Sequence, residues 1–211
     1  MKVRPLAAVA VAAVATSVLG FAFAQTPAPA AKPAAAPAAL SDNLPVPPPP
    51  KIEGKAWVLM DYATGQVLAG ENYDAQVEPA SITKVMTSYV VAAEMQAGKV
   101  KGTDPVMMSE HAWREGGAGT EGSYSGFEVN KTAPLLEMEK GMVVQSGNDA
   151  AIALAEHVAG SEDAFASLMN AYAARVGMKS SHFVNPHGLS EEGHVSTARD
   201  LAQLGRALIR D

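Results

Sequence analysis

The sequence predicts an α+β fold in which an early strand hairpin is followed by a run of amphipathic helices. Residues 56–61 and 66–72 are strand-like apolar runs on either side of a short glycine-containing turn at 63–65. Downstream, apolar residues recur every three or four positions in several segments, which is typical of helices that bury one face. No further good strand candidate follows, although a stable sheet normally needs about three strands or more. We therefore expect the chain to be the N-terminal part of a longer protein.

The composition excludes several classes of function. The 211 residues carry a net charge of −6 and no basic cluster, so we expect no nucleic-acid partner. Without cysteine, the chain has no disulfide framework, no cysteine nucleophile and no thiolate metal site. The histidines lack the H-E-x-x-H spacing of a helical zinc site, and we predict neither a metal nor a cofactor. The methionines fall in helical stripes and are expected in the core.

The first fifty residues indicate export. A short basic start precedes an apolar, alanine-rich run over residues 6–23, and Ala22-Phe23-Ala24 is a small-x-small cleavage site. These features predict a signal peptide at 1–24, with an uncleaved membrane anchor as the alternative. Residues 25–50 are almost all Ala and Pro, which predicts an extended, stiff linker. The folded domain is expected at 51–211.

The remaining elements follow from their start and stop signals. Good helix formers run from the Ser81 region without Gly or Pro until Gly98, which predicts the first helix. Further helices are predicted at 132–144, at 149–158, from an N-cap at Ser161 to a stop at Gly177, and from an N-cap at Ser196. Two segments are predicted to be irregular, namely 107–130 and 183–195, and the second could form a hairpin.

Residues 117–122 match G-x-G-x-x-G, a pattern found in dinucleotide-binding turns. That function requires a strand before the glycines and a helix opening from them, and neither is predicted here. We interpret the segment as a surface loop at the rim of a site.

Ser81-Ile82-Thr83-Lys84 is the first motif with a chemical meaning. If Ser81 lies at the start of the helix, Lys84 follows one turn later on the same face. A serine hydroxyl becomes a good nucleophile when a base takes its proton, and a neutral lysine can be that base. The helix N-terminus would also favour negative charge developing near Ser81. Alone, the pattern also fits an ordinary exposed helix.

Ser146-Gly147-Asn148 is the second motif, in a short break between two predicted helices. A serine there can relay a proton, and an asparagine can bind an amide carbonyl or a lysine. Alone, the motif also fits an ordinary turn with a capping residue. Together, S-x-x-K and S-x-N are two of the three motifs of penicillin-binding proteins and class A β-lactamases.

Over residues 51–211 the chain resembles the low-molecular-weight penicillin-binding proteins, specifically the serine-type D-alanyl-D-alanine carboxypeptidases of the peptidase S11 family. The stretches that carry the resemblance lie in the family's order at 79–84, 141–150, 159–162, 185–189 and 196–200. The resemblance implies a transpeptidase-like α+β fold, with an antiparallel five-stranded sheet and helices on both faces. It also implies an acyl-enzyme on Ser81, a proton acceptor at Lys84, a proton relay at Ser146 and substrate binding by Asn148. His187 is a weaker candidate for the pocket floor.

The resemblance further implies partners and a location. The substrate would be a peptidoglycan stem peptide ending in D-Ala-D-Ala, and β-lactams would acylate the same serine. The enzyme would act in the periplasm, at the outer face of the inner membrane, in cell-wall biogenesis and the control of cell shape. The family's third motif, K-T-G, is absent, since the only Lys-Thr pair, Lys131-Thr132, precedes Ala133. We therefore expect the chain to stop before the K-T-G strand and before any C-terminal membrane anchor.

Two other functions share the motifs. A class A β-lactamase would need a glutamate-containing deacylation loop, and Glu191-Glu192 stand in the wrong pattern for one. A penicillin-sensing or cell-wall-binding domain would be acylated without turnover, and release of D-Ala would distinguish the carboxypeptidase from it.

Overall fold

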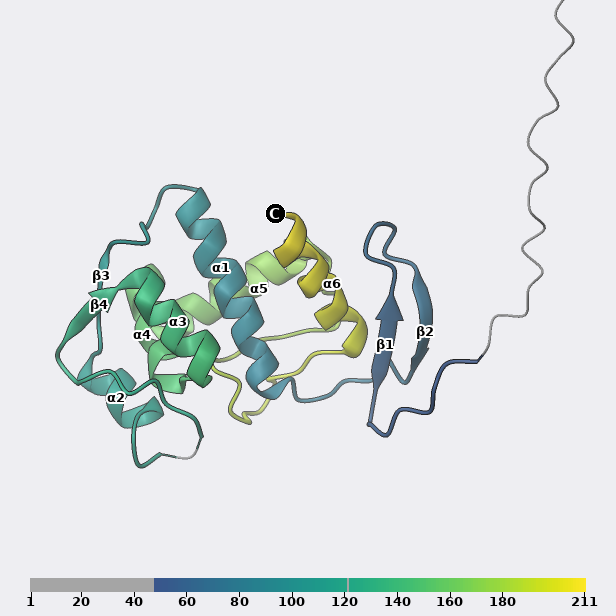
Figure 1. Cartoon of the computed structure of the whole chain (residues 1–211), viewed down its shortest axis with the longest axis horizontal. Coiled ribbons are helices and arrows are strands. Elements are labelled where there is room, and N and C mark those ends of the chain that lie inside the picture. The colour runs from purple at the N-terminus through teal and green to yellow at the C-terminus, as the bar shows by residue number, and fades with distance from the viewer. Residues whose placement is uncertain (1–47, 121) are drawn as a thin grey trace, which may run out of the picture. The chain divides into compact units, whose positions relative to one another are not determined.

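The computed structural model of the chain describes residues 48–120 and 122–211, so the predicted signal peptide and most of the predicted linker lie outside it (Figure 1). No helix in the described part is long and apolar enough to cross a membrane. The described elements are β1 Trp57–Met60, β2 Val67–Glu71, a 3-10 turn at Ala80–Ile82, α1 Thr83–Gln96, β3 Pro105–Met107, α2 Glu110–Gly116, β4 Thr132–Pro134, α3 Leu135–Gln145, α4 Asn148–Ala159, α5 Glu162–Val176 and α6 Ala198–Arg210.

The predicted hairpin is confirmed. Strands β1 and β2 pair antiparallel, with Trp57 opposite Glu71 and Leu59 opposite Ala69. The turn between them is closed by Asp61, whose Oδ1 accepts hydrogen bonds from the backbone N–H and the hydroxyl of Thr64 at 2.7 and 2.6 Å. Helix α6 packs on β1 (Figure 1). A second antiparallel pair, β3 with β4, lies among the helices at the other end of the described part.

Helix α4 is the centre of the helical layer. Every residue from Asn148 to Ala155 is buried, and α1, α2, α3 and α5 pack against it. Its many alanines allow the neighbouring helices to approach closely, while Ile152 and Leu154 fill the space between them. The predicted core position of the methionines is confirmed for Met86, Met108, Met138, Met142, Met169 and Met178. It is wrong for Met107, which is 54% exposed.

Two predicted boundaries are wrong. Residues 132–134 form strand β4 rather than the first turn of a helix, and α3 begins at Leu135. The cause is Pro134, which disfavours helical backbone at the preceding residue and fits best at a helix start. Residues 107–130 are not irregular throughout, because α2 lies within them. Its signal was present: Ser109 is an N-cap that accepts from the N–H of Ala112.

The helix caps are partly as predicted. Ser161 caps α5 by accepting from the N–H of Ala164, and Gly177 ends that helix in the left-handed region. The predicted cap at Ser196 is wrong, because Thr197 caps α6 by accepting from the N–H of Asp200. Ser196 instead pairs through its backbone with Val77 and through its hydroxyl with Ser181.

The carboxylate of Asp200 ties α6 to the segment after α5, and we expect its removal to destabilise the fold. It is buried and accepts from the Ser180 N–H at 2.7 Å and the Ser181 hydroxyl at 2.8 Å. Asp200→Ala removes two hydrogen bonds to a charged, buried acceptor, so the free energy of unfolding should fall by about 2–3 kcal/mol. Urea unfolding measures the loss. The exposed Glu128→Ala should stay within about 0.5 kcal/mol of the parent, and equal losses would contradict this role for Asp200.

Candidate active site

The side chains of Ser81 and Lys84 meet at the start of α1. Ser81 lies in the 3-10 turn that leads into the helix, and Lys84 follows one turn later. The Nζ atom of Lys84 lies 3.3 Å from the Oγ atom of Ser81. The geometry expected from the S-x-x-K spacing is therefore present.

Lys84 is buried, which changes its acid–base behaviour. Only 5% of the residue is exposed, and desolvation by burial lowers its pKa from 10.5 to about 8. A nonpolar surrounding disfavours the ammonium form, so a substantial fraction of the amine is neutral near that pH. A neutral amine next to a serine hydroxyl is able to accept its proton.

Ser146 brings the second motif to the same place. It follows the end of α3, and its hydroxyl donates to the Oγ atom of Ser81 at 3.2 Å. Ser81, Lys84 and Ser146 line a cavity of about 230 Å³ whose apolar residues are Val85, Met142, Val143 and Leu208. Two segments 65 residues apart in the chain thus converge on one oxygen.

The backbone is strained on both sides of this contact. Ala80 and Ser146 have φ angles of +47° and +56°. This left-handed region is unfavourable for residues other than Gly and Asn, and such residues gather at functional sites. The strain lies at Ser146 itself and at the residue before Ser81, so the surrounding packing must stabilise it.

Asn148 starts the central helix α4 two residues after Ser146, but it does not line the cavity of Ser81, Lys84 and Ser146. It is buried, and its N–H donates to the carbonyl of Ser123 at 2.8 Å. Gly122 lies so close that a Cβ there would stand 2.6 Å from the Asn148 Nδ2. Asp149 holds the same loop by accepting from the N–H and the hydroxyl of Ser125, both at 2.8 Å. The loop at 122–125 therefore lies against the start of α4, and Asp149, absent from the predicted site, anchors it.

The segment 185–188 covers Lys84. The Nζ atom donates to the carbonyl oxygen of His187 at 2.7 Å, and one turn further along α1 the hydroxyl of Thr87 donates to the carbonyl of Pro186 at 2.6 Å. His187 was predicted at the pocket floor, and its backbone does face the site. Sequence patterns could not show that the His187 carbonyl is the partner of Lys84, because every residue has a backbone carbonyl.

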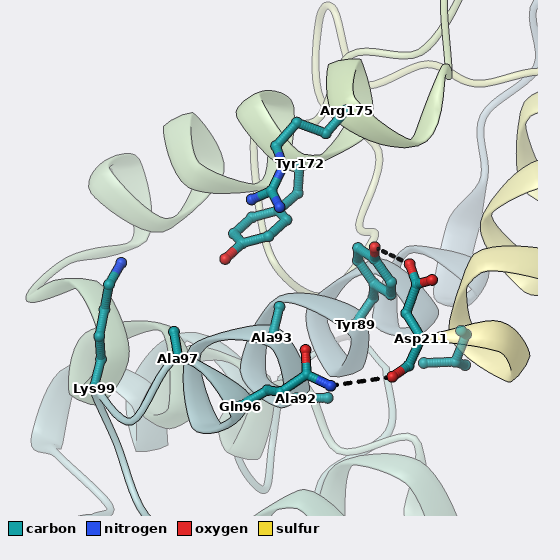
Figure 2. Close-up of a pocket in the computed structure, with 10 residues that line it drawn as sticks. Tyr89, Ala92, Ala93, Gln96, Ala97, Lys99, Tyr172, Arg175 and Asp211 are labelled. Carbon is teal, nitrogen blue, oxygen red and sulfur yellow. Dashed lines mark hydrogen bonds between the residues drawn. The ribbon is translucent and has the colours of Figure 1, made fainter. Parts of the chain in front are cut away.

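The predicted catalytic residues are absent from a second, larger cavity in the described part of the chain. A larger cavity, of about 670 Å³, lies between α1, α5 and the end of α6 (Figure 2). There Arg175 stacks over the ring of Tyr172, and Tyr89 donates to Asp211, but none of the predicted catalytic residues lines it. Among residues 48–120 and 122–211, no cluster of three or more His, Asp or Glu side chains is suited to a metal ion.

Comparison with known proteins identifies the family. Residues 43–211 match the family model of peptidase S11, D-alanyl-D-alanine carboxypeptidase. The chain belongs to this family. It is 47% identical over 163 residues to the D-alanyl-D-alanine carboxypeptidase DacC of Escherichia coli, covering 77% of this chain and 41% of that protein. It is 44% identical over 179 residues to DacA of the same organism, covering 82% of this chain and 44% of that protein.

Solved structures confirm the expected penicillin-binding-protein fold. Penicillin-binding protein 5 of Haemophilus influenzae aligns with a TM-score of 0.73 and 41% identity, covering 77% of this chain and 47% of that one. The carboxypeptidase DacD of Francisella tularensis aligns with a TM-score of 0.73 and 39% identity, covering 80% of this chain and 40% of that one. The chain thus spans less than half the length of these relatives.

Gly188 allows the segment 185–188 to lie against the site, and its replacement tests that arrangement. Its φ is +94°, and a Cβ there would overlap the carbonyl oxygen of Ala80. Gly193 has a similar φ of +84°, but its Cβ would meet no atom closer than 3.8 Å. Both Ala variants incur left-handed strain of about 1–2 kcal/mol, and only Gly188→Ala adds the overlap. Chemical unfolding should therefore show a clearly larger loss for Gly188→Ala; equal losses would mean that the segment does not lie against Ala80.

Proposed function

We propose that the protein to which this chain belongs is a serine-type D-Ala-D-Ala carboxypeptidase that removes the terminal D-Ala from peptidoglycan stem pentapeptides. The observation that carries the proposal is the position of the Ser81 hydroxyl, 3.3 Å from the Lys84 amine and 3.2 Å from the Ser146 hydroxyl. A nucleophile, a base with a lowered pKa and a relay on one oxygen are the requirements of acyl transfer. The membership of the S11 family selects the substrate class.

The acylation step uses these three groups. Neutral Lys84 takes the Ser81 proton as Oγ bonds to the carbonyl carbon of the penultimate D-Ala. Backbone N–H groups, including that of Ser81, stabilise the oxyanion, and each such donor is worth roughly 3–4 kcal/mol. The C–N bond then breaks, and Ser146 passes a proton to the leaving nitrogen of the terminal D-Ala. Water hydrolyses the ester in the reverse sense and frees Ser81.

The other site residues bind and orient the substrate. Asn148, buried at the start of α4, supplies an amide that can pair with a backbone group of the stem peptide. His187 contributes the carbonyl that holds Lys84. A β-lactam presents its strained amide to Ser81 in the same way and stops at the acyl stage.

We extend the proposal to the setting of the protein. The basic start, apolar run and small-x-small site of the first 24 residues support export by a signal peptide, followed by a stiff Ala/Pro linker at 25–50 and the peptidase domain at 51–211. Such an enzyme would act in the periplasm at the outer face of the inner membrane, contributing to cell-wall biogenesis and cell shape.

Penicillin labelling tests the nucleophile. The protein expressed as its gene encodes it should gain the mass of one penicillin, mapped by mass spectrometry to the peptide that contains Ser81. Ser81→Ala should lose the adduct, because the attacking oxygen is gone. The exposed Ser167→Ala should keep it. An adduct of undiminished yield in Ser81→Ala, or none in the parent, refutes the assignment.

The pH dependence of acylation tests the base. Lys84, with a pKa of about 8, is protonated below that pH and cannot accept a proton, so the acylation rate should rise with pH through about 8 and then level off. Lys84→Arg should abolish acylation over this range, since a guanidinium stays protonated. Stopped-flow measurement with a fluorescent penicillin gives both results. The exposed Lys179→Arg serves as the control, and near-normal acylation in Lys84→Arg would remove Lys84 from the base role.

A further inference from the structure

The imidazole of His187 has a defined orientation. Its Nδ1 accepts a hydrogen bond from the N–H of Leu189 at 3.2 Å, so a neutral ring carries its proton on Nε2. That Nε2 faces a carboxylate oxygen of Glu162, 3.5 Å away, and only 11% of the His187 side chain is exposed. The ring is thus held between its own backbone segment and helix α5.

Glu162 holds two histidines from different elements. It is the first residue of α5, where the helix dipole favours a negative charge. Its second oxygen lies 2.9 Å from Nε2 of His111 in α2. Burial raises the pKa of Glu162, but hydrogen bonds from His187 and His111 outweigh burial and hold that pKa below its usual range. The carboxylate is therefore ionised and links α2, α5 and the segment that covers Lys84.

We propose that Glu162 is a positioning residue for acylation, which holds His187 so that its main-chain carbonyl stays on the Lys84 amine. This inference rests on the proposed function. The same residue joins the two contacts: the ring of His187 meets Glu162, and its carbonyl oxygen lies 2.7 Å from Lys84 Nζ.

The carbonyl matters because a neutral amine has two N–H bonds and one lone pair. When one N–H is fixed on His187, the amine keeps its orientation and can present the lone pair to the Ser81 hydroxyl. If the carbonyl withdraws, the amine rotates and the lone pair faces Ser81 only part of the time. A misplacement of about 1 Å at such a contact can lower a rate by up to about a hundredfold.

The carbonyl also affects the acidity of Lys84. An acceptor stabilises the ammonium more than the amine, so its loss lowers the Lys84 pKa further. Several titratable groups surround the pair, and their charges bear on any pH profile: His111 and Glu115 of α2, Glu156 of α4, Asp163 of α5, and Glu191 and His194 around the segment itself. The test therefore compares variants of one position under identical conditions.

The experiment measures the acylation rate of the protein as its gene encodes it by a fluorescent penicillin between pH 6 and 10. Glu162→Ala should lower the high-pH plateau about tenfold and move the midpoint below that of the parent, because the His187 hold is lost. Glu162→Gln should restore the plateau to within about twofold, because its amide oxygen accepts from His187 while its N–H groups reach His111. Asp163→Ala, which removes an exposed acid from the same helical turn, should retain the parent plateau.

The outcomes separate this inference from the proposed function. If the parent is acylated and Glu162→Ala keeps both plateau and midpoint, the positioning role is overturned while the carboxypeptidase proposal stands. If Glu162→Gln loses as much as Glu162→Ala, the charge rather than the hydrogen bond acts, and the inference is also overturned. A smaller labelled fraction in Glu162→Ala, with an unchanged rate constant and midpoint, would show destabilisation alone and would also overturn the positioning role. Failure of the parent to be acylated at all would reject both proposals.

Discussion

The buried amino group of Lys84 is the feature on which the rest of this structure depends. Burying a lysine is costly for its charged form, and the protein relieves the cost by lowering the pKa to about 8 and by offering hydrogen-bond partners at Ser81 and His187. The same desolvation that makes the residue unfavourable as an ammonium makes it useful as a base. The neighbouring elements shield this amine from solvent and fix its orientation.

Three structural devices supply that environment. The first is the strained backbone at Ser146 and at Ala80, the residue before Ser81, beside the contact between the Ser81 and Ser146 hydroxyls. The second is the fully buried start of α4, which fixes Asn148 and Asp149 and through them the loop at 122–125. The third is the segment 185–188, which covers the amine and accepts hydrogen bonds from Lys84 and Thr87 through its backbone carbonyls. Strain of this kind persists only where surrounding packing over-determines it, and the alanine-rich α4 provides that packing.

Glu162 and its two histidine neighbours, His111 and His187, support the environment of Lys84 from further away. They connect α2, which lies far from the S-x-x-K motif in sequence, to the segment over Lys84. Ionised and partly buried, Glu162 gains from the α5 dipole and from two imidazoles. The polar contacts of the His187 ring therefore help to fix where the carbonyl groups of the segment 185–188 point.

Much of the site could be predicted from sequence, because its motifs are local. The spacing of Ser81 and Lys84 and the start of a helix place the two groups on one face whatever the rest of the chain does. The hairpin, the cap at Ser161 and the stop at Gly177 were likewise set by local rules. The predicted structure was wrong near Pro134, where α3 begins, and near Ser109, which caps α2. The proline and N-cap preferences that explain both elements are also local.

Only the tertiary structure decided how these pieces meet. The motifs by themselves do not give the distance between the Ser146 and Ser81 hydroxyls, the burial that lowers the Lys84 pKa, or the His187 carbonyl as the partner of Lys84. Contacts across 65 and 103 residues depend on how helices pack, and a backbone carbonyl leaves no residue-type signature. The sequence by itself determined which chemical groups are present and which helical face carries them. Packing around α4 determined their distances and protonation, because desolvation is a property of the folded neighbourhood and of no single residue.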